Sequence, residues 1–227
     1  AHAYHLLAPT EWSLAGRVTF LPGNASASFP FLTEMFTLAS MHLMEESFLG
    51  GLLGQTILFG FGVATSIGVG LLAARWFAVE AGWFAFLIYA TSPWTYRLSS
   101  IPYVEGALLF YLVLGLLVVS RMGESFPLGA HVAGLTAGAA FGCKYTALPF
   151  VVSFLAIGAL IQGRRQPVRT LSLFVLGFAL MGSVWLVRNY FWTGNPVYPL
   201  LYSWFGGADW SPELADKFAR GHQSTQF

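Results

Sequence analysis

The residues best suited to chemistry in this sequence are a few ionisable side chains set among long apolar stretches. Lys144 lies between two such stretches, Glu105 opens another, and Arg188 closes a third. A basic side chain in such a place can hold a phosphate, while a carboxylate beside it takes up or releases a proton. The pattern therefore indicates an anion-binding site with a carboxylate next to it.

Each of these side chains also has a simpler role. Lys144 could extend its ammonium group to a membrane interface without binding an anion. Glu105 at a helix start complements the positive end of the helix dipole, and Arg188 at a helix end complements the negative end. Arg97 fits an interfacial anchor, and His5 fits a structural hydrogen-bond donor. The sequence leaves both roles open at each position.

The composition indicates a membrane protein. Hydrophobic residues make up 56% of the 227 positions and charged residues 9%, against roughly a quarter charged in an average soluble domain. The formal net charge of +1 gives no field that would gather nucleic acid, so no nucleic-acid partner is expected. Cys143 is the only cysteine, which excludes an internal disulfide and a thiolate metal cluster.

Six apolar segments have about the length at which a helix crosses a bilayer. They are Gly51 to Ala74, Ala78 to Trp94, Pro102 to Ser120, Leu128 to Phe141, Tyr145 to Ile161 and Val168 to Tyr190. The fourth is short and rich in Gly and Ala, so it should pack against other helices rather than lipid. Because no strand alternation is visible, the sequence predicts an all-α polytopic bundle with about six transmembrane helices.

The basic residues predict how the bundle is oriented. Two apolar segments separate Arg75 from Arg121, and two more separate Arg121 from the cluster at 164–169, so all three lie on the same side. Short cytoplasmic loops collect Lys and Arg, so this side is expected to be cytoplasmic. The opposite, outer face then receives the N-terminal loop and the turn at Lys144. Phe31 to Phe48, which carries three glutamates, is expected to lie along the interface. A seventh span is the alternative.

We expect one membrane domain over residues 1–227, located in the bacterial cytoplasmic (inner) membrane with its site facing outward. Residues 1–50 would form an outer loop with juxtamembrane helices, 51–190 the transmembrane helices, and 191–227 the start of another outer loop. Because the chain begins and ends inside polar stretches without an initiator Met, it reads as a portion of a longer protein.

The outer face gathers most of the polar side chains that could act together, and ionisable groups at membrane depth usually line a cavity or a pathway. The candidates are Tyr4, His5, Glu34, Arg97, Tyr103, Glu105, Lys144, Arg188 and Asn189. No HExxH, CxxC, P-loop or GxGxxG pattern occurs, so zinc and nucleotide chemistry lack support. The sequence therefore predicts a site at this face with no metal-ligand set.

Several stretches resemble the membrane glycosyltransferases of the GT-C type, in the bacterial branch related to protein O-mannosyltransferases and the lipid A aminoarabinose transferase (glycosyltransferase family 39). Residues 4–22, YHLLAPTEWSLAGRVTFLP, resemble the first outer loop of that branch. FPFLTEMF resembles the entry to its next helix, and RNYFWTGNPVYPLLY a common outer-loop sequence. Glu105 in PYVEGALLF and Lys144 in GAAFGCKYTALPF match an acidic and a basic position of the family.

The resemblance implies inverting transfer of a sugar from a polyprenyl-phosphate donor to the hydroxyl of a lipid, glycan or protein acceptor. It implies catalytic roles for Glu105, His5 and Tyr4, donor-phosphate contacts from Lys144, Arg188 and Arg97, and an acceptor pocket with Glu34, Tyr103 and Asn189. The family's carboxylate base would stand just before Ala1, so these residues alone are expected to lack it and to be inactive. A dependence on a divalent cation stays open.

Two other functions compete with this one. A transporter or channel would also place charges at membrane depth, but it predicts inverted repeats and helices broken near the midplane, which the sequence does not show. A non-catalytic membrane subunit would need no ionisable cluster at one face. The glycosyltransferase hypothesis gives a role to more of the candidate residues than either alternative does.

Overall fold

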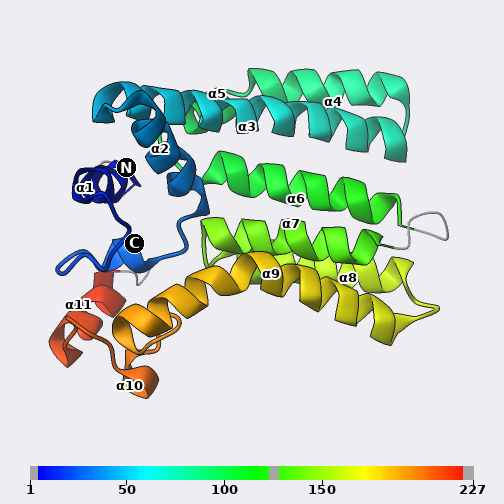
Figure 1. Cartoon of the computed structure of the whole chain (residues 1–227). Coiled ribbons are helices and arrows are strands. Elements are labelled where there is room, and N and C mark those ends of the chain that lie inside the picture. The colour runs from blue at the N-terminus through cyan, green and yellow to red at the C-terminus, as the bar shows by residue number, and fades with distance from the viewer. Residues whose placement is uncertain (1–4, 123–127, 222–227) are drawn as a thin grey trace.

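The computed structural model describes residues 5–122 and 128–221, and every regular element within them is helical. Six helices lie side by side and alternate in direction (Figure 1). They are α3 (Ser47–Trp76), α4 (Val79–Thr91), α6 (Glu105–Ser120), α7 (Gly129–Cys143), α8 (Ser153–Gln162) and α9 (Pro167–Thr193). The prediction of an all-α fold is confirmed.

The remaining helices gather at one end of these six, on the left in Figure 1, which we call the cap end. They are α1 (Leu7–Ala15), the 3-10 turn η2 (Ala25–Ser28), α2 (Leu32–Met44), α5 (Pro93–Ser99), α10 (Tyr202–Phe205) and α11 (Pro212–Gly221). We call the opposite end the arginine end, because Arg75, Arg121 and Arg164 lie in or beside its connections. There the Arg75 guanidinium joins α3 to α6 by donating to the Ser120 carbonyl at 2.6 Å.

Helix length supports fewer crossings than the sequence predicts. Within the described residues two helices are long and apolar enough to cross a membrane, α3 with 30 residues and α9 with 27. α4, α6 and the segment Leu148–Gln162 are apolar but shorter, and α7 has 15 residues. Length and composition therefore support two spans, and six are not established by them.

Glycines bring α7 and α9 into very close contact. A Cβ on Gly134 would lie 2.0 Å from the Phe174 carbonyl oxygen, and one on Gly177 would lie 2.2 Å from that of His131. Such contacts let helix backbones pack without intervening side chains. Most of α7 is buried as a result, as expected for the Gly- and Ala-rich segment. Leu155 of α8 and Phe174 of α9 complete the core around it.

The predicted interfacial helix over Phe31 to Phe48 is divided in the structure. α2 ends at Met44, and Glu45 has a left-handed φ of 53°, which turns the chain. The Glu46 carboxylate then caps the next helix by accepting from the Phe48 amide at 2.9 Å and from the Leu49 amide. α3 therefore begins at Ser47, four residues before the predicted start.

Two other segments are more structured or less regular than expected. The stretch between the predicted segments that end at Trp94 and begin at Pro102 contains most of α5, which begins at Pro93, a residue favoured in the first turn of a helix. The segment from Tyr145 starts with a wider π-helical turn, η3 (Leu148–Val152), which contains Pro149, and continues as α8. Both irregularities lie at proline residues near the cap end.

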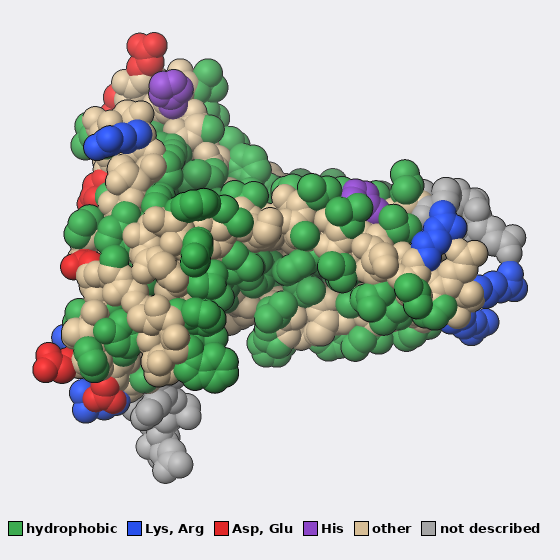
Figure 2. Space-filling model, turned by 60° about the horizontal axis from the view of Figure 1, so that its bottom comes forward, with side chains coloured by type: hydrophobic (Ala, Val, Ile, Leu, Met, Phe, Trp, Pro, Cys, Tyr) green, Lys and Arg blue, Asp and Glu red, His purple; other side chains and the backbone are tan. Residues whose placement is uncertain are grey.

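Charge is distributed unequally along the molecule. On the face shown in Figure 2, acidic and basic side chains appear together at the cap end, basic side chains alone mark the far end, and hydrophobic side chains cover much of the body between them. Along α9 no charged residue occurs between Arg169 and Arg188, and α3 carries only Arg75, near its end. The polar groups available for a site are therefore concentrated at the cap end.

Candidate functional site

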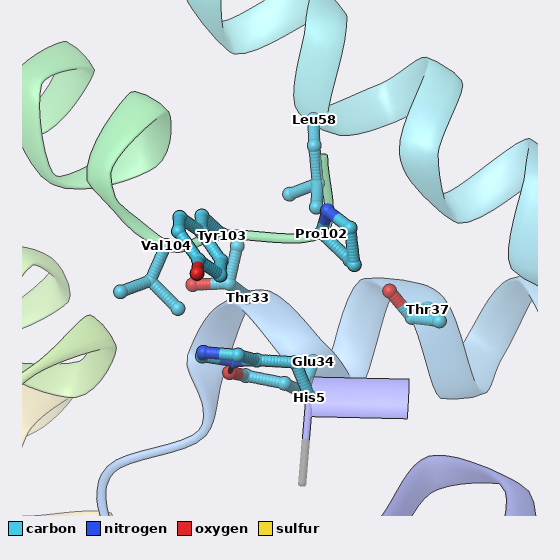
Figure 3. Close-up of a pocket in the computed structure, with 8 residues that line it drawn as sticks. All are labelled: His5, Thr33, Glu34, Thr37, Leu58, Pro102, Tyr103 and Val104. Carbon is cyan, nitrogen blue, oxygen red and sulfur yellow. Dashed lines mark hydrogen bonds and ion pairs between the residues drawn. The ribbon is translucent and has the colours of Figure 1, made fainter. Parts of the chain in front are cut away.

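A buried carboxylate and a histidine face each other at the cap end. Nδ1 of His5, just before α1, contacts Oε1 of Glu34 in the first turn of α2. Their side chains are only 8% and 4% exposed. Figure 3 shows the pair next to Tyr103, whose ring centroid lies 5.8 Å from that of His5. Residues 29 positions apart in the chain thus form one polar pair.

Burial sets the proton affinity of Glu34. Removal from water raises the pKa of this carboxyl above its ordinary value of 4.5, and the contact with His5 and the charge of Arg188 only partly oppose that effect. Its second oxygen, Oε2, makes no hydrogen bond within residues 5–122 and 128–221. A buried carboxyl of raised pKa beside an imidazole is suited to holding and passing a proton.

The pair lines a small pocket between α2, α3 and the α5–α6 loop. Thr33 and Thr37 of α2, Leu58 of α3 and the stretch from Pro102 to Val104 form the rest of its wall (Figure 3). The space among its lining atoms amounts to about 170 Å³ and is too narrow for a water-sized molecule. A substrate could reach His5 and Glu34 only if these segments separated.

A second ion pair lies where α6 begins and α7 ends. Nζ of Lys144, the C-terminal cap residue of α7, is 3.0 Å from Oε1 of Glu105, the first residue of α6. The Lys144 side chain is 44% exposed and that of Glu105 32%. The structure thus brings two predicted site residues together and leaves the ammonium group accessible to an anion from outside.

Arg188 is held far more tightly than Lys144. Its guanidinium lies between the rings of Trp185 and Trp192, with centroid distances of 4.9 and 4.6 Å. Nη2 donates to the carbonyls of Ser28 and Phe29 at 2.8 and 2.7 Å. Nη1 is buried and makes no hydrogen bond in the described part of the chain. Arg188 therefore fastens the N-terminal segment to α9 and contributes positive charge near Glu34.

Asn189 extends this contact toward Lys144. Its side chain is fully buried, and its Nδ2 donates to the Ser28 carbonyl at 2.7 Å and to the Tyr145 hydroxyl at 3.1 Å. Tyr145 directly follows Lys144, and its ring packs edge-on against Phe29. Asn189 thus positions the site rather than lining an open pocket.

These contacts lie near one another at the cap end. Tyr103 touches His5 and lies two residues before Glu105, which pairs with Lys144. The charge of Arg188 on α9 acts on Glu34 on α2 and partly opposes the rise in its pKa. We call His5, Glu34, Tyr103, Glu105, Lys144, Arg188 and Asn189 the cap-end cluster.

Two predicted residues are not in this cluster. Tyr4 lies outside the described residues. Arg97 lies on α5, exposed, with its guanidinium 5.9 Å from the centroid of the Trp94 ring, and the structure shows no contact between it and the cluster. Its predicted role at the donor phosphate stays a prediction.

Sequence reasoning missed the aromatic clamp around Arg188 and the carbonyls of Ser28 and Phe29. A signal for the clamp was present, because Trp185, Arg188 and Trp192 stand three and four residues apart and so share one helix face. No local signal indicates the carbonyl contacts, which span about 160 residues of sequence.

No group of three His, Cys, Asp or Glu side chains that could hold a metal ion occurs among residues 5–122 and 128–221. The described residues therefore offer no set of ligands for the divalent cation that the sequence leaves open. What the cluster offers is a proton-holding pair, an accessible ammonium group and a fixed guanidinium.

The comparisons with known proteins identify a family without assigning an activity. No curated protein and no solved structure matches the chain. A family model described as "Domain of unknown function (DUF8201)" matches residues 106–224, from the first turn of α6 through α11. The matched region contains Lys144, Arg188 and Asn189 and makes up more than half of the 227 residues. The chain therefore belongs to the DUF8201 family.

Proposed function

We propose that this protein is a membrane-embedded glycosyltransferase that moves a sugar from a polyprenyl-phosphate donor to an acceptor hydroxyl, with the cap-end cluster as its site. The proposal joins three features. The body of the molecule is apolar, polar groups gather at one end, and residues 4–22, Glu105 and Lys144 resemble GT-C glycosyltransferases.

The apolar surface supports placement in a bilayer. Large exposed hydrophobic side chains follow the outer faces of the long helices: Phe59, Val63, Ile67 and Leu71 on α3, Phe84, Leu87 and Ile88 on α4, and Leu176, Leu180, Val184 and Val187 on α9. On α3 they recur every four residues and form one continuous stripe. Contiguous exposed apolar patches of more than a few hundred Å² are rare on soluble monomers, whereas lipid tails would cover such faces.

The arrangement of the helices favours six crossings. α4, α6, α7 and α8 run between the same two ends as α3 and α9 (Figure 1). A 13-residue helix such as α4 is about 20 Å long, so its connections must complete the crossing of about 30 Å of hydrocarbon. Exposed Trp76 and Trp83 near the arginine end, and Trp94 near the cap end, suit aromatic belts at the two interfaces.

The charge distribution supports one orientation. Arg75, Arg121 and residues 164–169 lie at the arginine end, which we place on the cytoplasmic side of the inner membrane by the positive-inside rule. The cap-end cluster then faces outward, where a lipid-linked sugar can reach it from within the bilayer.

The cluster fits the chemistry of this transfer. A polyprenyl phosphate is a good leaving group, so the enzyme must mainly hold it, stabilise its developing charge and deprotonate the acceptor. Lys144 would contact the phosphate, with Glu105 orienting the ammonium group until the donor binds. Arg188 would add fixed positive charge. His5 and Glu34 would pass protons beside the carboxylate base that the resemblance places before Ala1.

The observation that carries the proposal is the Lys144–Glu105 pair at 3.0 Å, adjacent to the His5–Glu34 pair at the same end of the bundle. The test uses the full-length protein in membranes with a panel of radiolabelled polyprenyl-phosphate sugars. We expect transfer from at least one donor, and we expect Lys144→Ala to lower the rate by about 100-fold or more, the usual effect of removing a charge-stabilising group.

Lys217→Ala is the matched control, because Lys217 is an exposed lysine on α11 outside the cluster. It should transfer at the wild-type rate. Absence of transfer from every donor in the panel would count against the glycosyltransferase. Equal rates for wild type and Lys144→Ala would remove Lys144 from the site.

A further inference from the structure

A second cavity lies between α3, α4, α5 and α6, apart from the cap-end cluster. Its volume is about 470 Å³, within the range of roughly 300–1,000 Å³ that small-molecule pockets occupy. It is partly open rather than enclosed. None of its lining residues belongs to the cap-end cluster, so the proposed sugar transfer does not account for it.

The body of the cavity is apolar. Gly62 and Val69 line its α3 side, Ala85 and Ile88 line the α4 side, and Leu109 lines the α6 side. Gly62 and Val69 are two helical turns apart, so the slot runs about 10 Å along α3. Its α3 lining residues lie on the same stretch of α3 as the exposed stripe from Phe59 to Leu71. The slot therefore opens at the depth of the proposed hydrocarbon layer.

One end of the slot is polar. The hydroxyl-bearing lining residues Tyr89, Ser92, Thr95 and Ser99 come from the last turn of α4 and from α5 and its start. Trp94 lines the same end, and the exposed guanidinium of Arg97 lies 5.9 Å from the centroid of its ring. The apolar body with hydroxyls at one end, and a cation next to a residue that lines that end, matches an amphiphile with an anionic head and a hydrocarbon chain.

We propose that this slot binds one acyl chain of an anionic phospholipid whose phosphate lies at Arg97. The proposal rests on the membrane placement argued above, but not on sugar transfer. A guanidinium pairs well with phosphate oxygens through its planar set of donors. The surrounding bilayer supplies phospholipid at high concentration, so an acyl chain would occupy the slot when no other ligand is bound.

The phospholipid is distinct from the proposed sugar donor. Glu105 points toward Lys144, whereas the next residue, Gly106, lines the slot and faces the Leu58 carbonyl of α3. The two sites therefore lie on different sides of α6. A donor held by Lys144 and a phospholipid held by Arg97 would be separate molecules.

Two glycine positions supply a matched pair of variants. A Cβ on Gly106 would come no closer than 3.9 Å to another group, so Gly106→Leu fills the slot without a backbone clash. Gly60 lies on α3 with nothing within 4 Å of a Cβ, so Gly60→Leu adds the same side chain outside the slot. Ala85→Phe fills the slot from the α4 side as an independent variant.

The experiment places the full-length protein in nanodiscs containing phosphatidylglycerol with a photoactivatable diazirine on one acyl chain. Crosslinked residues are then located by peptide mass spectrometry. We expect enrichment at Leu98 and Leu109, a loss of at least fivefold at these positions in Gly106→Leu and in Ala85→Phe, and no loss in Gly60→Leu. Arg97→Gln should abolish the preference for this probe over the matching phosphatidylcholine probe.

The outcomes separate this proposal from the membrane placement. Crosslinks on the α3 stripe at Phe59 and Val63 without enrichment in the slot would overturn the acyl-chain site alone. Crosslinks at neither place would overturn the membrane placement as well. Displacement of the slot crosslinks by an equimolar polyprenyl phosphate would overturn the phospholipid site and would assign the slot to the donor lipid.

Discussion

The contact between His5 and Glu34 joins two deeply buried ionisable side chains at the cap end. Each side chain is less than a tenth exposed, and the second Glu34 oxygen makes no hydrogen bond in the described chain. A buried, incompletely paired carboxylate costs stability, which proteins tolerate mainly where the group has a function. The pair is therefore a good place to separate a functional role from a purely structural one.

Replacing Glu34 with Gln should change the pH dependence of stability. Because the pKa of Glu34 is raised above 4.5 in the folded protein, the folded state holds this proton more tightly than the unfolded state does. The wild type is therefore relatively more stable at low pH and loses stability as pH rises through the folded pKa. Glu34→Gln cannot ionise, so its Tm relative to wild type should rise by about a few degrees between pH 5 and pH 8.

Thermal unfolding of the detergent-purified protein at the two pH values measures this difference. Glu213→Gln is the control, since Glu213 is exposed on α11 and its replacement should shift Tm equally at both pH values. A Tm gap for Glu34→Gln that stays constant from pH 5 to pH 8 would show that Glu34 is not the titrating group.

Part of the site could be predicted from residue types alone. Lys144 and Glu105 stand out because charges are rare in an apolar chain, and the structure pairs them. The partnership of His5 and Glu34 could not be predicted, because it depends on how the segment before α1 packs on α2. The same holds for Arg188, whose carbonyl partners Ser28 and Phe29 come from a distant turn.

At the scale of helices, close backbone packing holds the site in place. Lys144 caps the end of α7 and α9 carries Arg188, so the spacing of these cations depends on the glycine contacts between the two helices. Gly134 packs directly against the Phe174 backbone, in the place where any other residue would carry its Cβ. A backbone contact of this kind cannot be relieved by a rotamer change.

Gly134→Ala should therefore destabilise the protein. The added Cβ would lie 2.0 Å from the Phe174 carbonyl oxygen, and forcing a methyl group into a packed interface costs typically about 1–3 kcal/mol. Gly60→Ala is the matched control, because a Cβ there meets nothing within 4 Å and helix propensity favours Ala by up to about 1 kcal/mol. Thermal unfolding in detergent compares the two variants. Equal Tm values would contradict the tight α7–α9 contact.

Hydrophobic segments predicted the positions of the six helices that lie side by side, but not all of their ends. The predicted segment from Val168 to Tyr190 lies within α9, because continuous apolar composition is a strong helix signal. The break between α2 and α3 was predicted after Phe48 rather than at Glu45 and Glu46, because its position depends on a left-handed residue and a side-chain cap rather than on hydrophobicity. α5 was missed because a helix of seven residues gives little periodic signal.

At the scale of the whole molecule, the account depends on the separation of two ends. The cap end carries the proposed transfer site and the arginine end carries Arg75 and Arg121. Composition alone predicts a membrane protein, but only the antiparallel order of the six helices puts the predicted site residues together at one end (Figure 1). If both ends faced the same compartment, the proposed route of a lipid-linked donor to Lys144 would fail.

The most direct measurement is the labelling of single cysteines in sealed, right-side-out membrane vesicles with a membrane-impermeant maleimide. Cys143→Ala supplies a background without the native thiol, which is buried. Ser100→Cys reports on the cap end and Arg164→Cys on the arginine end, and both positions are exposed. We predict that Ser100→Cys labels in intact vesicles and that Arg164→Cys labels only after permeabilisation. Equal labelling of both in intact vesicles would contradict the account.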